Sequence, residues 1–284
     1  MENLKEVVIV SGVRLPVGSF GGSLKDISAI DMGAMVVKEA VKRAGIEPSD
    51  VDETIVGQVG QIAECGFVAR AVSLKAGLPE TTCAYSVNRQ CGSGLQAIAD
   101  AVMEIQTGFA DVVVAAGTEN ISQLPYYVKD GTVTAGNSSS LNDGAAAVVV
   151  MSREKADALG VKPLLTIKGC TVAGNDGAVM GYAPKLSSEK LAAKLGLDLK
   201  AIDMFEINEA FASQAFAVRR DLGLDPEKVN IYGGGISIGH PIGATGVILA
   251  VKVLYELQRT DKKDAMVSMC IGGGQGISMY FTKD

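Results

Sequence analysis

A cysteine stands where a strand-like segment meets a helical one. The apolar residues 83–87 (CAYSV) lead to Cys91, and the sequence GSG follows it before a helical pattern begins. This arrangement places a thiol on a sharp turn at a helix N-terminus, where free N–H groups and the helix dipole favour a thiolate. Such a turn also leaves backbone N–H groups free to bind an oxyanion. The sequence therefore predicts that Cys91 is a nucleophile, and a buried structural cysteine is the alternative.

The second group of candidates lies in a glycine-rich turn, residues 233–246 (GGGISIGHPIGATG), ahead of another helical pattern. This turn holds His240, the only histidine in the chain. Glycines permit positive φ angles and a close approach of backbone to ligand. An imidazole in such a loop is poorly placed for packing, so we interpret His240 as a base, with a structural histidine as the alternative. A phosphate loop is disfavoured, because neither GxGxxG in its strand-turn-helix context nor GxxxxGK[ST] fits.

Two further candidates stand at the ends of apolar strands. Cys270 closes an apolar run and precedes the sequence IGGGQG, whose backbone can offer N–H groups. Asn208 is a polar residue where a strand-like segment meets a helix. Together with Cys91 and His240 they supply a nucleophile, a base, a second acid/base and oxyanion donors.

Composition restricts the class of protein. The chain has 284 residues, of which 48% are hydrophobic, so it can bury a core of one large or two medium domains. Its net charge of −6 argues against a broad nucleic-acid-binding surface. The five cysteines are widely spaced and form no CxxC pair, which fits neither a disulfide framework nor a zinc site. No apolar run is long enough to span a membrane and no signal peptide is evident. We expect a cytoplasmic protein with free thiols and no metal.

Elements that could position these residues follow a regular alternation. Continuous apolar strands alternate with helical patterns, which predicts an α/β fold with sheets covered on both faces. Ser28 and Asp31 mark the start of a helix and Gly45 its end. The strand-like segments of the first half are 7–10, 53–59, 83–87, 111–117 and 145–151.

The second half repeats the first in outline. Corresponding segments, first half and then second, are 7–10 and 164–167, 85–87 and 229–232, and 112–116 and 265–270. A repeat near half the chain length indicates a duplication rather than a solenoid. We predict two halves, 1–151 with Cys91 and 152–284 with His240 and Cys270, whose equivalent turns meet around a pseudo-two-fold axis.

The sequence resembles the thiolase family over nearly its whole length. The matching stretches, in family order, are NRQCGSGLQA (88–97), TAGNSSSLNDGAA (134–146), GNDGAVMGYAP (174–184), EINEAFA (206–212), GGISIGHPIGATG (234–246) and CIGGGQG (270–276). Related condensing enzymes of fatty-acid synthesis mostly pair their cysteine with histidines, so the second cysteine in CIGGGQG and the GHPIG stretch point to thiolases. The resemblance implies duplicated βαβαβαββ halves in an αβαβα layered arrangement.

The resemblance also implies a role for each candidate. Cys91 would accept an acyl group as a thioester, and His240 would lower the Cys91 pKa and later donate to a thioester oxygen. Cys270 would take the α-proton of acetyl-CoA. A water held by Asn208, together with His240, would form one oxyanion hole, and the N–H groups of Cys91 and Gly272 would form the other. The substrate-binding residues expected are Ser139, which lines the pantetheine channel, Met180 and Phe211.

The implied activity is that of an acetyl-CoA acetyltransferase. It joins two acetyl-CoA by Claisen condensation to give acetoacetyl-CoA plus CoA, or runs the reverse thiolysis, with coenzyme A as substrate or product and no cofactor. The resemblance also implies a homodimer through the N-terminal halves, with a tetramer possible, and no nucleic-acid or membrane partner. A degradative 3-ketoacyl-CoA thiolase and a thiolase-like core with little or no activity are the alternatives.

The chain departs from the family between Glu119 and the TAGN stretch. A sizeable insertion usually separates these segments in the family and provides much of the grip on CoA. Here the connector near 121–133 essentially lacks it. We therefore expect weak CoA binding by a protein whose Cys91 remains chemically competent.

Overall fold

The helices begin and end at residues that the sequence marks as caps. The computed structural model describes residues 4–62, 66–124 and 140–284. In α1 (Ala29–Ala44) the Ser28 hydroxyl accepts a hydrogen bond from the Asp31 N–H, and the helix ends at Gly45 in the left-handed conformation, as predicted. Two more helices, α2 (Val68–Ala76) and α3 (Ser93–Thr107), also end at left-handed glycines.

The remaining elements alternate along the chain as the sequence predicts. The other helices are α4 (Arg153–Leu159), α5 (Ala183–Leu195), α6 (Ala212–Asp221), α7 (Gly235–Ile238) and α8 (Thr245–Arg259), with 3-10 turns η1 (Pro48–Asp50), η3 (Ile121–Gln123), η4 (Gly177–Tyr182) and η5 (Pro226–Lys228). The strands are β1 (Val7–Arg14), β2 (Gly18–Ser19), β3 (Glu53–Gly57), β4 (Cys83–Val87), β5 (Val112–Asn120), β6 (Asn142–Ser152), β7 (Leu165–Gly174), β8 (Phe205–Ile207), β9 (Asp264–Ile271) and β10 (Gln275–Lys283).

Strand order confirms the duplication. The path is β4-β3-β5-β6-β1-β7-β10-β9-β8, and β2 pairs with β6. From the junction outward, the first half runs β1-β6-β5-β3-β4 and the second half runs β7-β10-β9-β8, so the four strands of the second half take the places of β1, β6, β5 and β3. The halves meet where β1 and β7 pair antiparallel, with Val8 opposite Thr166 and Ile9 opposite Leu165. The two units, the second of which lacks a counterpart of β4, therefore share one junction at their first strands.

The second half departs from the first at its third strand. The segment predicted at 229–232 forms only an isolated bridge between Val229 and Phe205. Asn230 has a positive φ of 50°, and its side-chain amide accepts a hydrogen bond from the Ile207 N–H and donates one to the Ile207 carbonyl. This amide therefore replaces the backbone ladder that a continuing strand would make.

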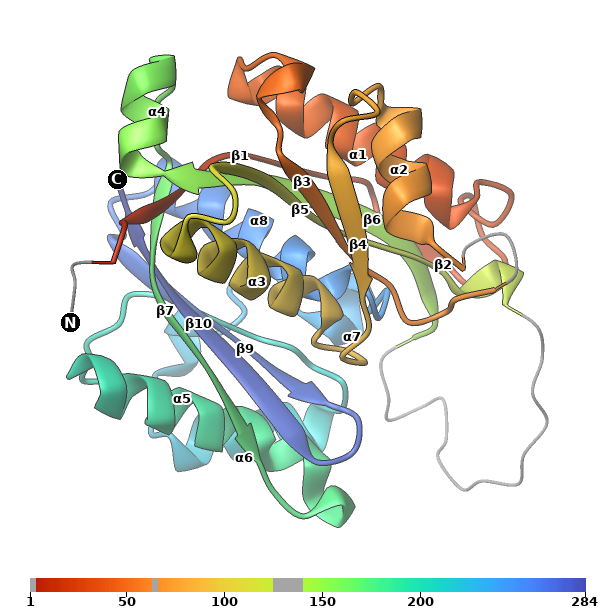
Figure 1. Cartoon of the computed structure of the whole chain (residues 1–284). Helices are drawn as coiled ribbons and strands as arrows, with labels where there is room; N and C mark the ends of the chain where they lie inside the picture. The colour runs from red at the N-terminus through yellow and green to blue at the C-terminus, as the bar shows by residue number, and fades with distance from the viewer. Residues whose placement is uncertain (1–3, 63–65, 125–139) are drawn as a thin grey trace.

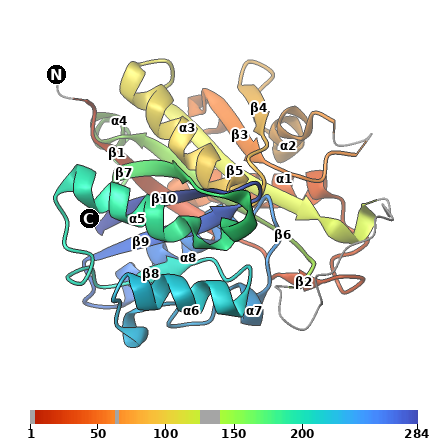
Figure 2. The ribbon, with the colours of Figure 1, turned by 90° about the horizontal axis from the view of Figure 1, so that it is seen from below.

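The layers follow the predicted αβαβα arrangement (Figures 1 and 2). α1 and α2 cover the outer face of the first-half sheet, and α5 and α6 cover the outer face of the second-half sheet. α3 and α8 lie between the two sheets, and their apolar side chains form one core with the inner faces of both. The N-termini of α3 and α8 therefore lie close together inside the molecule.

The connector is described only in part. The segment near 121–133 is described as far as Leu124 and contains the 3-10 turn Ile121–Gln123. Ser139, predicted to line the pantetheine channel, lies outside the described residues. Within the described ranges, no helix combines the length and apolar character needed to cross a membrane.

Candidate active site

Cys91 lies on a strained turn between β4 and α3. The preceding residue, Gln90, has a positive φ of 46°, which is unfavourable for a side chain larger than glycine. The Ser93 hydroxyl holds this conformation, because it donates to the Gln90 carbonyl at 2.6 Å and accepts from the Arg89 N–H at 2.9 Å. The turn directs the half-buried thiol of Cys91 beside the start of α3, as the sequence predicts for a nucleophile elbow.

The hairpin between β9 and β10 brings the second thiol to the first. Ile271 packs its side chain against the backbone of Gly92, and the backbone N–H of Gly272 lies near enough to the Cys91 thiol to lower its pKa. Cys270 is fully buried, close enough to Cys91 that a charge on one thiol raises the pKa of the other. The structure thus brings Cys91, Cys270 and Gly272 together from opposite halves of the chain.

The His240 loop is held from the first half of the chain. The His240 N–H donates to the Asn142 side-chain oxygen at 2.8 Å, and the Asn142 amide donates to the Gly18 carbonyl at 3.0 Å. Asn142 also fills the space beside Gly239, whose φ is 99° and whose Cβ, if present, would lie 2.6 Å from Asn142 Cγ. A glycine is therefore required at 239 on both grounds.

One hydroxyl determines the tautomer of His240. His240 Nδ1 lies 2.6 Å from Thr245 Oγ1, and Thr245 Oγ1 donates its only proton to the Pro241 carbonyl at 2.8 Å. Thr245 must therefore accept the hydrogen from Nδ1, which leaves a lone pair on Nε2. Nε2 faces Asn208, with 3.4 Å between it and Asn208 Nδ2. His240 is thus arranged as a base through Nε2.

Asn208 closes the site from the end of β8. Its backbone N–H donates to the Ser268 carbonyl at 2.9 Å, and its side chain is fully buried. Asn208 Oδ1 has no hydrogen-bond partner among the described residues. A buried amide oxygen without a partner is costly, so this group has capacity for a bound molecule. The four predicted catalytic side chains and Gly272 are therefore gathered at the ends of α3, α8, β8 and β9.

Burial sets the protonation states of these groups. Burial lowers the pKa of His240 to about 4 and raises that of Cys270 to about 12. Burial also raises the pKa of Cys91, opposed by the Gly272 N–H and the N–H of Cys91 itself. The direction for Cys91 differs from the lowered pKa that the sequence predicts, because desolvation outweighs the helix terminus. The resting pair is a neutral thiol and a neutral imidazole.

Glu119 fastens the His240 loop to the first half. This buried carboxylate accepts hydrogen bonds from the backbone N–H groups of Val59, Gly60 and Gly243 at 2.8–3.1 Å. Burial raises its pKa, while the three N–H groups lower it. Glu119 also raises the pKa of Cys91 through its charge. It therefore fixes the loop and acts on the nucleophile without contacting it.

The predicted substrate-binding residues Met180 and Phe211 line one cavity of about 440 Å³ between η4 and the start of α6. The segment before η4 packs on the catalytic hairpin, since the Asn175 N–H donates to the Gly274 carbonyl at 2.8 Å. The two side chains are thus brought together next to the hairpin that carries Gly272. Their role in binding substrate stays a prediction.

Two known family models match the chain, and together they cover most of it. The model of the thiolase C-terminal domain matches residues 161–283, and that of the thiolase N-terminal domain matches residues 7–130 and 123–154. The chain belongs to the thiolase family. This thiolase is accordingly an acyltransferase enzyme.

Individual relatives agree with the family models. The acetyl-CoA acetyltransferase of Syntrophomonas wolfei is 34% identical, over 97% of this thiolase and 98% of the relative, and that of Escherichia coli is 35% identical, over 99% and 100%. A crystal structure of the Bacillus anthracis acetyl-CoA acetyltransferase superposes with a TM-score of 0.95 at 33% identity and covers 99% of both chains. Human mitochondrial 3-ketoacyl-CoA thiolase in complex with CoA superposes with a TM-score of 0.93 at 30% identity, over 99% and 98%.

This thiolase is shorter than its relatives at one place. The two alignments run over 389 and 392 positions, whereas the chain has 284 residues. The match to the N-terminal family model breaks into two parts that meet at residues 123–130. The residues that the relatives have in addition therefore fall at the shortened connector.

Sequence reasoning missed the residues that hold the catalytic groups. These residues do not take part in the reaction themselves. Each makes a hydrogen bond to the His240 loop: Thr245 to the ring of His240, Glu119 to the Gly243 N–H and Asn142 to the His240 N–H. A signal was available for two of them, since Glu119 and Asn142 are polar residues next to fully apolar strand segments. Such residues are buried only when a specific partner compensates their desolvation.

Proposed function

We propose that this thiolase transfers acetyl groups between CoA thioesters: two acetyl-CoA give acetoacetyl-CoA plus CoA, and the reverse reaction is thiolysis. The observation that supports the proposal is the packing of two pairs on neighbouring elements. Cys91 lies close to Cys270, and His240 lies 3.4 Å from Asn208, which hydrogen-bonds the Ser268 carbonyl on the strand that carries Cys270. The names of the acetyl-CoA acetyltransferase relatives support the choice of acetyl-CoA.

The first half-reaction forms an acyl-enzyme on Cys91. His240 Nε2 takes the thiol proton, and the Cys91 sulfur attacks the thioester carbonyl carbon. The N–H groups of Cys91 and Gly272 stabilise the oxyanion. The C–S bond of the thioester then breaks, the departing CoA sulfur takes the Cys270 proton, and Cys270 is left as a thiolate.

The second half-reaction forms the carbon–carbon bond. The Cys270 thiolate removes the α-proton of a second acetyl-CoA, whose thioester oxygen is stabilised by protonated His240 and a water on Asn208. The carbanion attacks the acetyl carbon on Cys91 and expels the Cys91 thiolate. That thiolate recovers its proton from His240, so every group returns to its starting state. This chemistry requires no organic cofactor or metal.

A test must separate catalysis from mere retention of the fold. We expect the chain to cleave acetoacetyl-CoA in the presence of CoA, and Cys91→Ala to abolish cleavage. Cys91→Ser, which keeps the size of the side chain, is the matched control and should also lose the activity because a hydroxyl is a far weaker nucleophile. Activity that survives Cys91→Ala rejects the mechanism. No turnover by a protein whose Cys91 still reacts with iodoacetamide favours a thiolase-like core without catalysis.

The proposed assembly is a homodimer formed through the first half. β4 is an edge strand in the sheet order, and its residues are exposed or half-buried. An unpaired edge is a template for pairing with a second chain. We expect sedimentation at twice the mass of one chain, and a monomer at micromolar concentration would contradict the proposal.

A further inference from the structure

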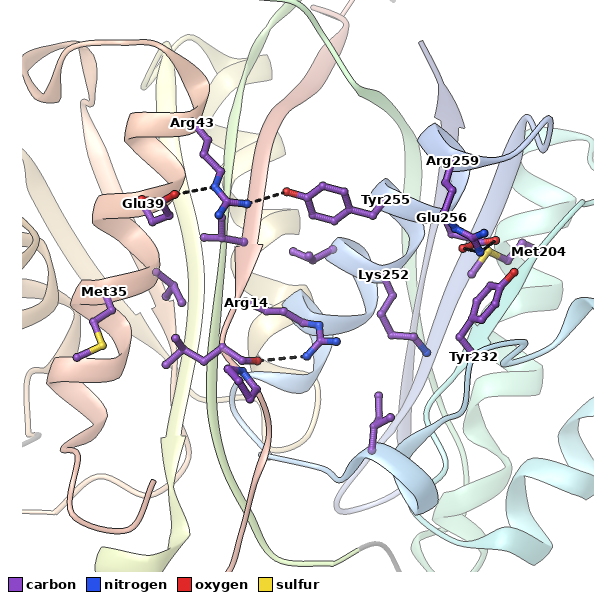
Figure 3. A pocket seen from close by; sticks show the side chains of 16 residues that line it. Arg14, Met35, Glu39, Arg43, Met204, Tyr232, Lys252, Tyr255, Glu256 and Arg259 are labelled. Carbon is purple, nitrogen blue, oxygen red and sulfur yellow. Dashed lines mark hydrogen bonds and ion pairs between the residues drawn. The ribbon is translucent and has the colours of Figure 1, made fainter. Parts of the chain in front are cut away.

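A cavity of about 870 Å³ lies along α8, apart from the catalytic residues. It is lined by the end of β1, the middle of α1 and the second half of α8 from Val251 to Arg259, together with Met204, Tyr232 and Ile238 at the end of α7. Figure 3 shows Arg14 between the side chains of α1 and those of α8. Val251 lies about 9 Å along the helix from Thr245, at 1.5 Å per residue. Ile238, two residues before His240, also lines the cavity, so the cavity borders the His240 loop although His240 itself does not line it.

The lining of the cavity combines an apolar floor with a polar rim. Val36 and Val251 are buried at its base, and Met35 and Tyr255 stand half-exposed above them. The volume falls in the range of small-molecule sites, which are mostly apolar with a few placed polar groups. An exposed apolar surface of this kind is a candidate for a ligand with an apolar body.

The charged side chains around the cavity indicate the head group of that ligand. Three of the four cations at the cavity have a carboxylate partner: Arg43 with Glu39 at 2.8 Å, Arg259 with Glu256 at 2.7 Å and Lys252 with Glu206 at 2.6 Å. The fourth, Arg14, donates only to the neighbouring Leu15 carbonyl at 3.2 Å and has no carboxylate partner in the described part of the chain. The cavity thus holds one uncompensated positive charge in a protein whose net charge is −6.

We propose that this cavity binds an amphipathic monocarboxylate, such as a medium-chain fatty acid. The carboxylate pairs with the Arg14 guanidinium, whose fork matches a carboxylate in a bidentate arrangement. The alkyl chain lies over Val36 and Val251. A dianion or a nucleotide phosphate fits less well, because the other cations are already neutralised by carboxylates.

The proposed site is separate from the catalytic centre but touches the same turn. Tyr232 precedes the Gly233–Gly239 segment that leads to His240, and Ile238 lies within it. Lys252, which lines the cavity, donates to the Gly233 carbonyl at 2.6 Å. The cavity shares no residue with the catalytic set, so its ligand and the acyl-CoA substrate occupy different places.

The test uses the absence of tryptophan from the chain. Met35→Trp places a single fluorophore on the cavity wall, and Phe109→Trp places one on an exposed residue outside it. Titration with sodium octanoate should give saturable quenching with Met35→Trp and none with Phe109→Trp. Equal responses from both reporters indicate non-specific binding and overturn the proposal, as does the absence of any saturable response.

Two variants and one analogue of octanoate test where the ligand binds and whether its carboxylate is recognised. In the Met35→Trp background, Arg14→Gln should weaken octanoate binding by about 5- to 10-fold, the effect of an exposed ion pair of roughly 1 kcal/mol. Arg220→Gln, on α6 and outside the cavity, should leave binding unchanged. Octanol, which lacks the carboxylate, should bind equally well to Met35→Trp with Arg14 and to Met35→Trp with Arg14→Gln. Octanoate affinity that Arg14→Gln does not alter overturns the proposal.

Competition and mass distinguish the other occupants. Protein alkylated at Cys91 should bind octanoate with unchanged affinity, whatever the outcome of the thiolysis assay. Loss of binding after alkylation places octanoate in the catalytic channel and rejects a separate site. A change of sedimenting mass on Arg14→Gln alone identifies the cavity as a contact between copies of the chain and likewise rejects it.

Discussion

At the residue scale, the Thr245 hydroxyl decides which nitrogen of His240 is basic. Thr245→Val keeps the shape but removes the acceptor for Nδ1–H, so the Nε2 lone pair is no longer fixed. We expect the rate of Cys91 alkylation by iodoacetamide at pH 7 to fall about 10-fold, less than the roughly 10²- to 10⁴-fold that a general base contributes, because the imidazole itself is still present. Thr245→Ser should restore the wild-type rate and pH profile. An unchanged pH profile in Thr245→Val would show that the hydroxyl only supports packing.

His240 also gives the stability of the protein a pH dependence. Its pKa is lowered by burial from 6.5 to about 4 in the folded state. The unfolded chain therefore binds a proton first as the pH falls through 6.5, and this contribution to stability is lost between pH 6.5 and 4. The loss is roughly 3 kcal/mol, from 1.36 kcal/mol per pKa unit.

Chemical unfolding of wild type and His240→Gln at pH 7 and at pH 4 measures this effect. The difference in unfolding free energy between the two proteins should shrink by roughly 3 kcal/mol at the lower pH. Other buried carboxylates titrate in both proteins and cancel in the difference. A difference that stays constant would mean that folding leaves the pKa of His240 unchanged.

The sequence predicted the residues that we propose to react, and missed the residues that orient them. Cys91, His240, Cys270 and Asn208 could be selected because their side chains have chemistry that stands out at strand or helix ends. Thr245 could not, because its role exists only through distances to His240 and Pro241. The direction of the Cys91 pKa was also out of reach, since it depends on how deeply the turn is buried.

At the element scale, the contact between α3 and α8 depends on a glycine. A Cβ on Gly246 would lie 2.2 Å from the Leu95 backbone nitrogen, which cannot move without shifting α3. Gly246→Ala should therefore destabilise the protein by about 3 kcal/mol or more, although alanine favours a helix. Gly33→Ala in α1 is the matched control, because its Cβ would meet a side-chain methyl group of Val72, at 2.7 Å, and not the backbone of a second helix.

Thermal unfolding of the two variants compares these outcomes directly. We expect Gly33→Ala to stay within about 1 kcal/mol of wild type, since the gain in helix propensity offsets the contact. Gly246→Ala should also slow Cys91 alkylation, because α3 and α8 carry Cys91 and the Thr245 partner of His240. Equal stability of the two variants would refute the role of the close crossing.

Helix ends could be predicted where the capping residues lie next to the helix in sequence. The strand predicted at 229–232 is not formed, apart from an isolated bridge at Val229. Ser28 and Gly45 mark helix ends by their own chemistry, and the structure places them as predicted. Asn230 looked like part of an apolar strand, yet its side chain takes the hydrogen bonds of Ile207 and ends the pairing. That choice depends on a residue 23 positions away in sequence, which no local pattern reveals.

At the scale of the whole molecule, the sequence predicted the duplication but not the pairing of β1 with β7 that joins the two halves. Repeated strand and turn patterns predicted two similar halves, and the strand order confirms them. The pairing of β1 with β7 joins segments about half a chain apart through two residue pairs. Continuous apolar strands carry no register signal for such a contact, so only the structure shows how the two sheets meet.

Because its connector is short, this thiolase should bind coenzyme A weakly and still acetylate Cys91. The family insertion, which by resemblance provides much of the CoA grip, falls where the chain is shortest, whereas the groups around Cys91 are all in place. We expect calorimetry to give a Kd for CoA weaker than about 1 mM, equivalent to roughly −4 kcal/mol. A small acetyl thioester should still acetylate Cys91, detected by mass spectrometry, and Cys91→Ala is the control. CoA binding as tight as that of the Bacillus anthracis relative, measured alongside, would show that the insertion is dispensable for CoA. Failure of Cys91 to accept acetyl from the small donor would show that the remaining core has lost its chemistry.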